Sequence, residues 1–296
     1  RDLNLVKVFF AGADRVRGLA NVSTASVKAP ERAAPMAAEE EVVVEVDEVH
    51  KSFGPHEVLK GVSLDIPKNK ISVIIGGSGS GKSVIMKHII GLFQPDMGSV
   101  KVFGQDMSKL DSRDMLEMRS RFGMLFQGAA LLDSMSVRQN VSFPLAERGV
   151  AKADVERETD AILEKLSLTE IAKSFPSAIS NGERKRVGLA RAIITRPEIM
   201  IYDEPTTGQD PVMIRYVDDM IVEAQELFDI TALVVSHDMA SAFRVAHQIA
   251  FLHQGEIRAC GSPAQVSANP DPWVRRFIFA GTPEGDKACR ELGLEH

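Results

Sequence analysis

The amino-acid sequence predicts an α/β fold with a parallel-sheet core, an antiparallel β subdomain and a helical insertion subdomain. Two apolar strand patterns, at residues 199–202 and 231–235, are separated by a helical pattern at residues 212–228. This alternation is typical of a parallel sheet, because parallel strands need a crossover connection between them. Residues from about 108 to 196 show mostly helical patterns, so we expect a helical subdomain to interrupt the core.

The residues before the core predict the antiparallel subdomain. Residues 42–46 and 62–66 are rich in valine and other β-formers, which favours two strands. A further pattern at residues 71–75 is apolar throughout, as expected for a strand that is buried on both faces of a parallel sheet. Within the insertion, residues 154–166 and 184–194 have the apolar spacing of amphipathic helices.

The composition is typical of a globular protein that can bury a large core. Of the 296 residues, 44% are hydrophobic and 26% are charged. The formal net charge of −6 argues against nonspecific nucleic-acid binding, so we expect no nucleic-acid partner. The two cysteines, Cys260 and Cys289, form neither a disulfide framework nor a metal-ligand spacing. Since no apolar run approaches the roughly 18 residues of a membrane span, we expect membrane contact only through a partner.

We divide the sequence into three parts. Residues 1–41 are expected to be a flexible N-terminal extension or linker, since residues 20–41 are rich in alanine and polar residues. Met36 is a candidate natural start, and an organelle-targeting remnant is the alternative interpretation of the residues before it. Residues 42–281 form the main domain, and residues 282–296 are a C-terminal tail with a possible dimer contact.

A glycine-rich loop at residues 76–83 matches the phosphate-binding pattern G-x-x-x-x-G-K-[ST]. It follows the strand pattern at 71–75 and precedes a helical pattern at 84–90, which is the order that this loop requires. Its backbone N–H groups and the helix N-terminus would face a phosphate. Lys82 would meet the β and γ phosphates, and the Ser83 hydroxyl would ligate Mg²⁺. The predicted phosphate-binding residues are Gly76, Gly77, Ser78, Gly79, Ser80, Gly81, Lys82, Ser83 and Val84.

Two adjacent carboxylates, Asp203 and Glu204, directly follow the strand pattern at 199–202. In open α/β sheets, ligands bind at the carboxyl ends of the strands. Asp203 is therefore a candidate Mg²⁺ ligand through water, and Glu204 is a candidate to orient or deprotonate an attacking water. The structural alternative is an acidic N-terminus for the helix that follows Pro205.

Two more polar side chains follow strand patterns. His237 comes after the second core strand and is a candidate to hydrogen-bond the γ-phosphate. Gln127 comes after the strand pattern at 122–126, and its amide is a candidate contact for Mg²⁺ or water. The loop behind it, residues 128–135, is unusually apolar for a connection. It is either a core-facing turn or a docking groove for a partner helix.

These motifs, in this order, resemble those of ATP-binding cassette (ABC) ATPases, the motor subunits of ABC transporters. The resemblance extends from about residue 42 to residue 281. It implies a P-loop NTPase fold, ATP and Mg²⁺ as cofactors, and ATP hydrolysis coupled to transport. It also implies that Phe53, between two strand patterns, stacks on adenine. The residues that carry the resemblance are the loop at 76–83, Gln127, Asp203, Glu204 and His237.

The segment that corresponds to the family's Leu-Ser-Gly-Gly-Gln signature departs from it. This chain has Ser180, Asn181, Gly182 and Glu183 there, preceded by an isoleucine. Asn replaces Gly best where a left-handed backbone is needed, so the loop geometry can be kept. The same residues also form an S-x-x-E capping box for the following helix. The resemblance implies that Ser180, Asn181 and Gly182 contact nucleotide bound to a second copy, in a head-to-tail dimer with two ATP molecules.

Further segments resemble the ATPases of Mla-type lipid transport systems. They are residues 126–131, residues 269–277, and the segment in which Gln209 precedes Asp210, the D-loop residue implied to face nucleotide. This resemblance implies a transmembrane permease and an Mce-domain lipid-binding protein as partners, with phospholipids moved between envelope membranes. The implied location is the cytoplasmic face of the inner membrane or, alternatively, the stromal face of the chloroplast inner envelope. An ABC importer for another cargo and a nontransport ABC ATPase remain alternatives.

Overall fold

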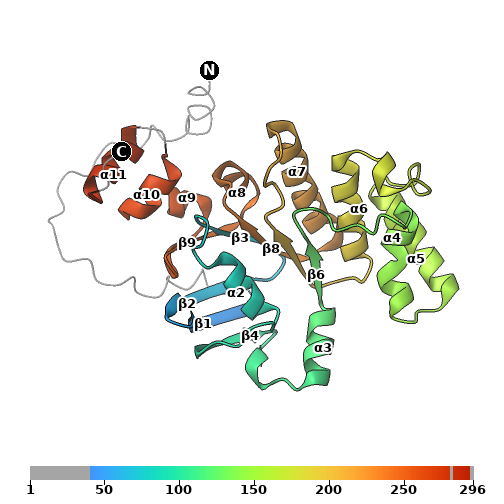
Figure 1. Ribbon diagram of the computed structural model, residues 1–296, viewed down its shortest axis with the longest axis horizontal. Coiled ribbons are helices and arrows are strands. Elements are labelled where there is room, and N and C mark those ends of the chain that lie inside the picture. Colours follow the sequence, from blue (N-terminus) through green and yellow to red (C-terminus); the bar gives the residue numbers. More distant parts are fainter. Residues whose placement is uncertain (1–40, 281–282, 294–296) are drawn as a thin grey trace. The chain divides into compact units, whose positions relative to one another are not determined.

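Two β-sheets organise the part of the chain that the computed structural model describes, residues 41–280 and 283–293 (Figure 1). One sheet has four strands and the other has six. Apart from Glu41, the predicted N-terminal extension lies outside the described residues. The expected combination of an antiparallel subdomain, a parallel core and a helical insertion is confirmed.

The four-stranded sheet has the order β2-β1-β4-β5, and its strand pairs are antiparallel. Its valine-rich strands place alternate side chains in the core, as Val44 and Val46 do with 0% and 2% exposure. The two predicted strands are confirmed but are much longer than the predicted segments. The strands are β1 (Val42–Phe53), β2 (His56–Pro67), β4 (Met97–Val102) and β5 (Gln105–Asp106).

The six-stranded sheet has the order β10-β9-β3-β8-β7-β6. Every neighbouring pair is parallel except β9 with β10, which is antiparallel. The predicted parallel core is therefore confirmed, whereas β9 and β10 were not predicted. The strands are β3 (Ile71–Ile75), β6 (Phe122–Leu125), β7 (Ile199–Asp203), β8 (Thr231–Ser236), β9 (Gln248–His253) and β10 (Glu256–Gly261).

The helical insertion lies beyond the β6 edge of this sheet, where α4 contacts α5 and α6, and α6 contacts β6 (Figure 1). The span expected to be a helical subdomain, about residues 108 to 196, is not helical throughout. It contains β6, which pairs with β7 in the core sheet, so the chain enters the sheet between α3 and α4. Among the described residues, the first six helices are α2 (Lys82–Ile89), α3 (Ser112–Ser120), α4 (Val137–Glu147), α5 (Lys152–Lys165), α6 (Asn181–Ile193) and α7 (Pro211–Phe228).

The remaining helices follow the core towards the C-terminus. Of these, α10 contacts α9, α11 and β10. The predicted C-terminal tail thus includes a helix, α11, that packs on the preceding helix of the same chain. The elements are α8 (Met239–Val245), α9 (Pro263–Ser267), α10 (Pro272–Ile278) and α11 (Pro283–Glu291), with short 3₁₀ turns at η1 (Met107–Lys109) and η2 (Pro176–Ala178).

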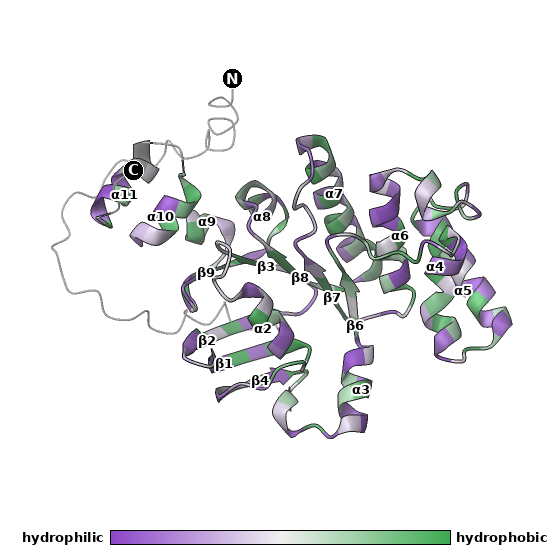
Figure 2. Cartoon of the chain, in the orientation of Figure 1, coloured by the Kyte–Doolittle hydropathy of each residue, from purple (hydrophilic) through white to green (hydrophobic). Residues whose placement is uncertain are grey.

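Alternate side chains of the parallel strands enter two different hydrophobic clusters. Met200 and Tyr202 of β7 pack with α4 to α10, whereas Ile199 and Ile201 pack with α2 and the antiparallel sheet. Both faces of the sheet are therefore covered, which explains the continuous apolar strands seen in Figure 2. None of the helices within the described ranges has the length and apolar character that crossing a membrane requires.

A buried ion pair joins α7 to α8. Asp218 of α7 is 0% exposed and bonds the Ser241 hydroxyl and the Arg244 guanidinium of α8, with Arg244 Nη1 at 2.6 Å from Asp218 Oδ2. Because α8 begins directly after His237 and Asp238, this pair fixes the segment that carries His237.

We expect Asp218→Ala to lower the free energy of unfolding by about 3–5 kcal/mol, because it leaves a partly buried guanidinium and a buried hydroxyl unpaired. Urea denaturation of the purified chain measures this loss. The neighbouring Asp219 is exposed on the same helix, so Asp219→Ala is the control and should change the value by no more than about 0.5 kcal/mol. Equal effects of the two substitutions would show that the pair does not stabilise the fold.

Candidate functional site

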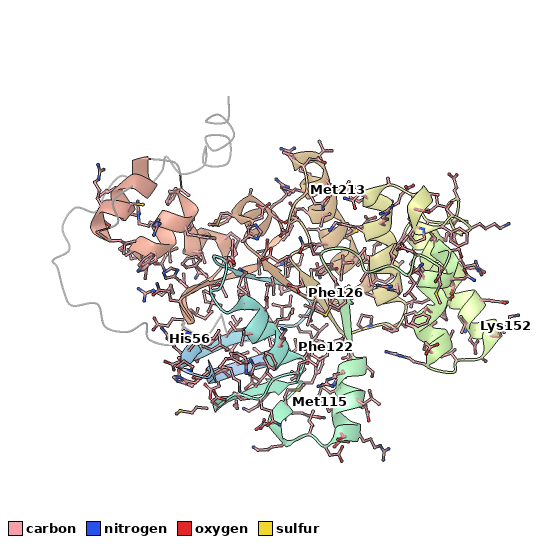
Figure 3. All side chains as sticks on the ribbon, viewed as in Figure 1. His56, Met115, Phe122, Phe126, Lys152 and Met213 are labelled. Carbon is pink, nitrogen blue, oxygen red and sulfur yellow. The ribbon has the colours of Figure 1, made fainter. Side chains whose placement is uncertain are left out.

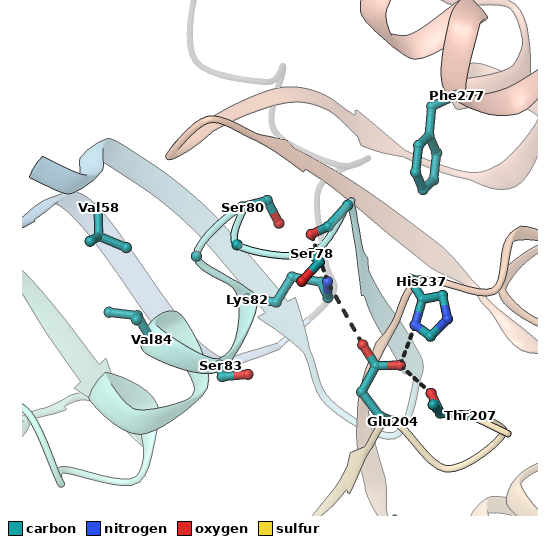
Figure 4. A pocket seen from close by; sticks show the side chains of 13 residues that line it. Val58, Ser78, Ser80, Lys82, Ser83, Val84, Glu204, Thr207, His237 and Phe277 are labelled. Atoms are coloured by element: carbon teal, nitrogen blue, oxygen red, sulfur yellow. Dashed lines mark hydrogen bonds and ion pairs between the residues drawn. The ribbon is translucent and has the colours of Figure 1, made fainter. Parts of the chain in front are cut away.

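A cavity of ≈ 730 Å³ opens at the carboxyl ends of the central parallel strands (Figure 4). The glycine loop forms one wall, and residues that follow β7 and β8 form another. The structure thus brings the loop, Glu204 and His237 together, as expected from their positions directly after strand patterns. The lining residues are Val58, Gly77, Ser78, Gly79, Ser80, Gly81, Lys82, Ser83, Val84, Glu204, Thr207, His237 and Phe277.

The glycines of the loop are required by its backbone. Gly79 and Gly81 have φ angles of 75° and 110°, which side chains of L-residues rarely tolerate. A Cβ atom on Gly76 would lie 2.2 Å from the Leu252 carbonyl oxygen of β9, so the loop and β9 can touch only at a glycine. The helix that follows, α2, has no side-chain cap. Its first N–H groups are therefore available to an anion such as a phosphate.

Lys82 is the cation of this cavity, although only 7% of the residue is exposed. Its Nζ donates to the carbonyl oxygens of Gly76 at 2.8 Å and Gly77 at 3.0 Å, and lies 3.7 Å from Glu204 Oε1. Burial lowers the pKa of Lys82, while the carboxylates of Glu204 and Asp203 act in the opposite direction. A phosphate in the cavity would add negative charge beside the ammonium and stabilise its charged form.

Glu204 is held from several sides. Its backbone has a left-handed φ of 48°, and its N–H donates to the Val235 carbonyl of β8 at 2.8 Å. Its Oε2 lies 2.7 Å from His237 Nδ1 and accepts from Thr207 Oγ1 at 2.8 Å. Such backbone strain is characteristic of functional sites, where the surroundings hold a side chain in one position. The carboxylate therefore points into the cavity with a defined orientation (Figure 4).

The remaining predicted Mg²⁺ ligands lie around the same edge of the sheet. Ser83 lines the cavity, Asp203 is the last residue of β7, and Gln127 lies two residues after the end of β6. Burial, and next the neighbouring carboxylate of Glu204, raise the pKa of Asp203, whereas Lys87 and Lys82 lower it.

This arrangement fits Mg²⁺ that arrives with a nucleotide. Among the described residues, no cluster of three or more histidine, cysteine or acidic side chains forms a metal site. Mg²⁺ keeps several waters and takes substrate phosphate oxygens, so it needs only one or two protein ligands. The Ser83 hydroxyl and the Asp203 carboxylate are of the right kind, and a cation would relieve the repulsion between Asp203 and Glu204.

Phe53, the predicted adenine-stacking residue, is the last residue of β1 and is 43% exposed. Its ring lies edge-on to Phe93 with centroids 5.4 Å apart, and Lys51 Nζ lies 5.8 Å from its centroid. It is outside the lining described above, where Val58, Val84 and Phe277 supply the apolar surface. Adenine stacking on Phe53 therefore stays a prediction.

The signature segment forms the start of α6 and does not line this chain's own cavity. Ser180 is the N-cap, and the predicted capping box with Glu183 is present, with Glu183 Oε2 accepting from Ser180 N at 2.7 Å. Asn181 is the first helical residue and has no positive φ, so this position does not need a left-handed backbone. The helix already begins at Asn181. Gly182 has little room for a side chain, since a Cβ would lie 3.2 Å from Tyr216 Cε1.

Asp210 also lies away from the cavity lining. It is the N-cap of α7, and its Oδ1 accepts from the N–H groups of Val212 at 2.9 Å and Met213 at 3.0 Å. The preceding residue, Gln209, accepts a 2.8 Å hydrogen bond from the Asn181 amide. Asn181, one of the residues that depart from the family signature, therefore contacts the segment that carries Asp210.

Three lining residues were not predicted from the sequence. Thr207 is three residues after Glu204. A hydroxyl so close in sequence to a candidate catalytic carboxylate was the one signal that could have predicted its place in the cavity. Val58 and Phe277 carry no sequence signal for this role, because an apolar side chain in β2 or α10 is usually part of a core. Phe277 contacts Phe251 of β9, with ring centroids 4.9 Å apart, and this contact brings α10 to the cavity.

The fold and the site define a P-loop nucleotide hydrolase, and comparison with known proteins gives its family. Residues 59–207 match the family described as ABC transporter. The "Probable ribonucleotide transport ATP-binding protein mkl" of Mycobacterium leprae is 38% identical over 240 residues, which are 80% of this chain and 69% of that protein. The "Arginine/ornithine transport ATP-binding protein AotP" of Pseudomonas aeruginosa is 36% identical, over 81% of this chain and 98% of that protein. The chain belongs to the ABC transporter family.

Solved structures agree with this assignment. CbiO1 from Clostridium perfringens, described as part of the ABC transporter complex cbiONQ, has a TM-score of 0.73 and 24% identity, over 85% of this chain and all of that one. The ATP-binding cassette MJ0796, in a dimeric post-hydrolysis state bound to ADP and Pi, has a TM-score of 0.64 and 27% identity. The match covers 74% of this chain and 98% of that one. The chain is accordingly an ATP-binding ATPase of this family, with ATP and Mg²⁺ as its cofactors.

We expect Glu204→Gln to slow ATP hydrolysis by about 10²- to 10⁴-fold, because the amide cannot accept a proton from water. ATP binding should be retained, since the phosphate loop is unchanged. Steady-state turnover and equilibrium nucleotide binding measure the two effects. Glu198 lies immediately before the opposite end of β7 and pairs with Arg121, so Glu198→Gln is the control. Turnover close to that of the native chain would exclude Glu204 as the catalytic base.

We expect Lys82→Ala to weaken ATP binding by about 10- to 100-fold, because it removes a charge-assisted hydrogen bond worth about 1.5–3 kcal/mol. Titration with a fluorescent ATP analogue gives the affinity. Lys152 of α5 is the control residue, because its side chain is 91% exposed (Figure 3) and it is far from the phosphate loop in sequence. Lys152→Ala should leave the ATP affinity unchanged. Unimpaired binding by Lys82→Ala would contradict the phosphate-cradle interpretation.

Proposed function

We propose that this chain is the ATP-hydrolysing motor subunit of an ABC transporter that moves phospholipids between envelope membranes. In this proposal it works as a homodimer, with a transmembrane permease and an Mce-domain lipid-binding protein as partners. The observation that carries the motor function is the convergence of Lys82, Glu204 and His237 on one cavity beside the phosphate loop.

Hydrolysis follows from the groups around Glu204. Its carboxylate accepts a proton from the attacking water, whose oxygen bonds the γ-phosphorus as the bond to the β–γ bridging oxygen breaks. Lys82 binds the phosphates, and His237 and Thr207 hold the carboxylate in place. Mg²⁺, held by Ser83 and by Asp203 with Gln127 nearby, would supply electrostatic stabilisation of the phosphate charge when bound. The products are ADP and phosphate.

A second copy would complete the nucleotide site. Ser180, Asn181 and Asp210 are exposed and lie outside the cavity of their own chain. Their role in the proposal is to contact nucleotide held by the phosphate loop of the partner subunit, in the head-to-tail arrangement that the family resemblance implies. The Asn181–Gln209 hydrogen bond supports this interpretation, because it orients the signature segment and the D-loop on one surface.

The apolar loop after Gln127 is the proposed docking site for the permease. Ala129 is 2% exposed and Leu131 packs on the core, whereas Leu132 is 38% exposed and Phe126, just before Gln127, is 44% exposed. The loop is thus in part a core-facing turn, and its exposed apolar side chains support the docking groove as a proposal. An exposed apolar surface of this kind suits an amphipathic partner helix. Membrane association would then come through the permease, at the cytoplasmic face of the inner membrane or, alternatively, the stromal face of the chloroplast inner envelope.

The lipid cargo rests on the Mla-type segments at residues 126–131 and 269–277 and on Gln209. The second segment includes α10, whose Phe277 lines the nucleotide cavity and whose Trp273 stacks on His253 with centroids 4.2 Å apart. The names of similar proteins favour other cargoes, since they include ribonucleotide, arginine/ornithine and methionine transport. An importer for such a solute is therefore the second candidate, and a nontransport ABC ATPase is the third.

We expect the chain, affinity-purified from membranes of its own source cells, to bring down a permease, an Mce-domain protein and phospholipid. Leu132→Glu should remove these partners, because a charge would be buried at the docking surface, and it should leave the ATPase activity of the isolated chain intact. Leu116 is 71% exposed on α3, so Leu116→Glu is the matched control. Mass spectrometry of proteins and lipids is the readout.

The outcomes separate the candidates. A permease without an Mce-domain protein or bound phospholipid would reject the lipid cargo and favour a solute importer. Undiminished recovery of the permease with Leu132→Glu would place the docking surface elsewhere on the chain.

A further inference from the structure

Lys185 is a buried ammonium that the hydrolysis reaction does not use. It lies on α6 and is 2% exposed. Its Nζ donates to the carbonyl oxygens of Gln127 at 2.8 Å and Pro205 at 2.6 Å. Within the described ranges no acidic side chain forms an ion pair with it, and burial lowers its pKa. A buried cation that is held only by two main-chain carbonyls is costly to the fold, so its bonds call for a functional explanation.

Both carbonyls belong to segments that border the proposed machinery. Gln127 begins the apolar loop proposed to meet the permease, and Pro205 is the residue directly after Glu204. Helix α6, which carries the ammonium, begins at the signature segment with Ser180 as its N-cap. One side chain therefore connects the proposed docking loop, the residue next to Glu204 and the helix that begins at the signature segment.

The two segments joined by Lys185 are also strained. Ala129, Ala130 and Glu204 have φ angles of 59°, 46° and 48°, in the left-handed region that L-residues avoid. Strained residues keep such conformations only where the surrounding structure holds them. When the surrounding structure that holds such a segment moves, the segment can relax to a less strained backbone conformation. A partner that displaces this structure would therefore change the conformation of the segment.

Arg191, about two turns further along α6, holds the docking loop but not the catalytic segment. Its guanidinium donates to the carbonyls of Ala130 at 2.8 Å and Ala129 at 2.9 Å. Between the two cations, Gly188 lets the loop lie directly on the helix, since a Cβ there would be 3.0 Å from the Ala129 Cβ. Both side chains bond the loop, but only Lys185 also bonds the Pro205 carbonyl. Comparing substitutions of the two residues therefore separates the effect of the bond to Pro205 from the effect of holding the loop.

We propose that Lys185 is a positioning residue that couples the loop at 127–135 to the orientation of Glu204. Displacement of the loop moves the ammonium, and the ammonium moves Pro205 and the carboxylate beside it. The inference rests on the proposed function in one respect, the role of Glu204 in hydrolysis. It requires no direct contact between Lys185 and nucleotide.

The test compares Lys185→Met and Arg191→Met in the purified chain, by ATP turnover, ATP affinity and amide hydrogen exchange. Methionine is an unbranched side chain of similar length that has no N–H group to donate a hydrogen bond. We expect Lys185→Met to lower turnover by about 10²-fold through misplacement of Glu204, with unchanged ATP affinity. It should speed exchange in residues 127–135 and in residues 204–210. Arg191→Met should speed exchange only in residues 127–135.

The double variant Lys185→Met with Glu204→Gln distinguishes positioning from a general structural effect. Because Lys185 acts through Glu204, single-turnover hydrolysis by the double variant should equal that of Glu204→Gln alone. A further loss in the double variant, or native turnover in Lys185→Met, would overturn the proposal. Lys185→Arg keeps a cation and should preserve the linked exchange of the two segments even if the methionine variant does not fold. Independent exchange of the segments in Lys185→Arg would count against the coupling.

The failure of the proposed function gives a different result. In that case Glu204→Gln hydrolyses ATP at the native rate, while the exchange measurements still report whether Lys185 links the two segments.

Discussion

The parallel pairing of β3, β8 and β7 is the constraint on which the rest of the site depends. Its register sets Ile75 beside Ser236 and Asp203 beside Val235. The next residues of each strand, Gly76, His237 and Glu204, therefore leave the sheet at one edge. Because both faces of the sheet are covered, the only place where these groups can meet a ligand is that edge. A shift of one residue in this register would separate the carboxylate from the imidazole and from the phosphate loop.

The edge concentrates charge that a nucleotide with Mg²⁺ can neutralise. Lys82 is held by loop carbonyls, and the adjacent carboxylates of Asp203 and Glu204 repel each other in a partly buried setting. Phosphate and a divalent cation together complement these charges. The same partly buried environment strengthens each interaction relative to water, which is why orientation by His237 and Thr207 matters for the chemistry.

Helix α6 links this edge to the outer surfaces of the molecule. Its N-terminus presents the signature segment, and its buried Lys185 and partly buried Arg191 hold the loop after β6. The left-handed residues of that loop and of the catalytic segment make both segments sensitive to what supports them. In the proposed transporter, nucleotide chemistry, association of two copies and docking of a membrane partner would thus be connected through the packing of one helix.

The local elements of this protein can be predicted from short-range sequence patterns. The strand, glycine loop and helix at 71–90, the acidic pair after β7 and His237 after β8 follow from patterns of hydropathy, glycine and polarity, and the capping box at Ser180 is equally local. Contacts between distant residues become visible only in the folded chain: Phe277 with the cavity, Asn181 with Gln209, and Lys185 with both Gln127 and Pro205. These contacts depend on strand register and on helix packing against the sheet, and neither is encoded in the spacing of neighbouring residues.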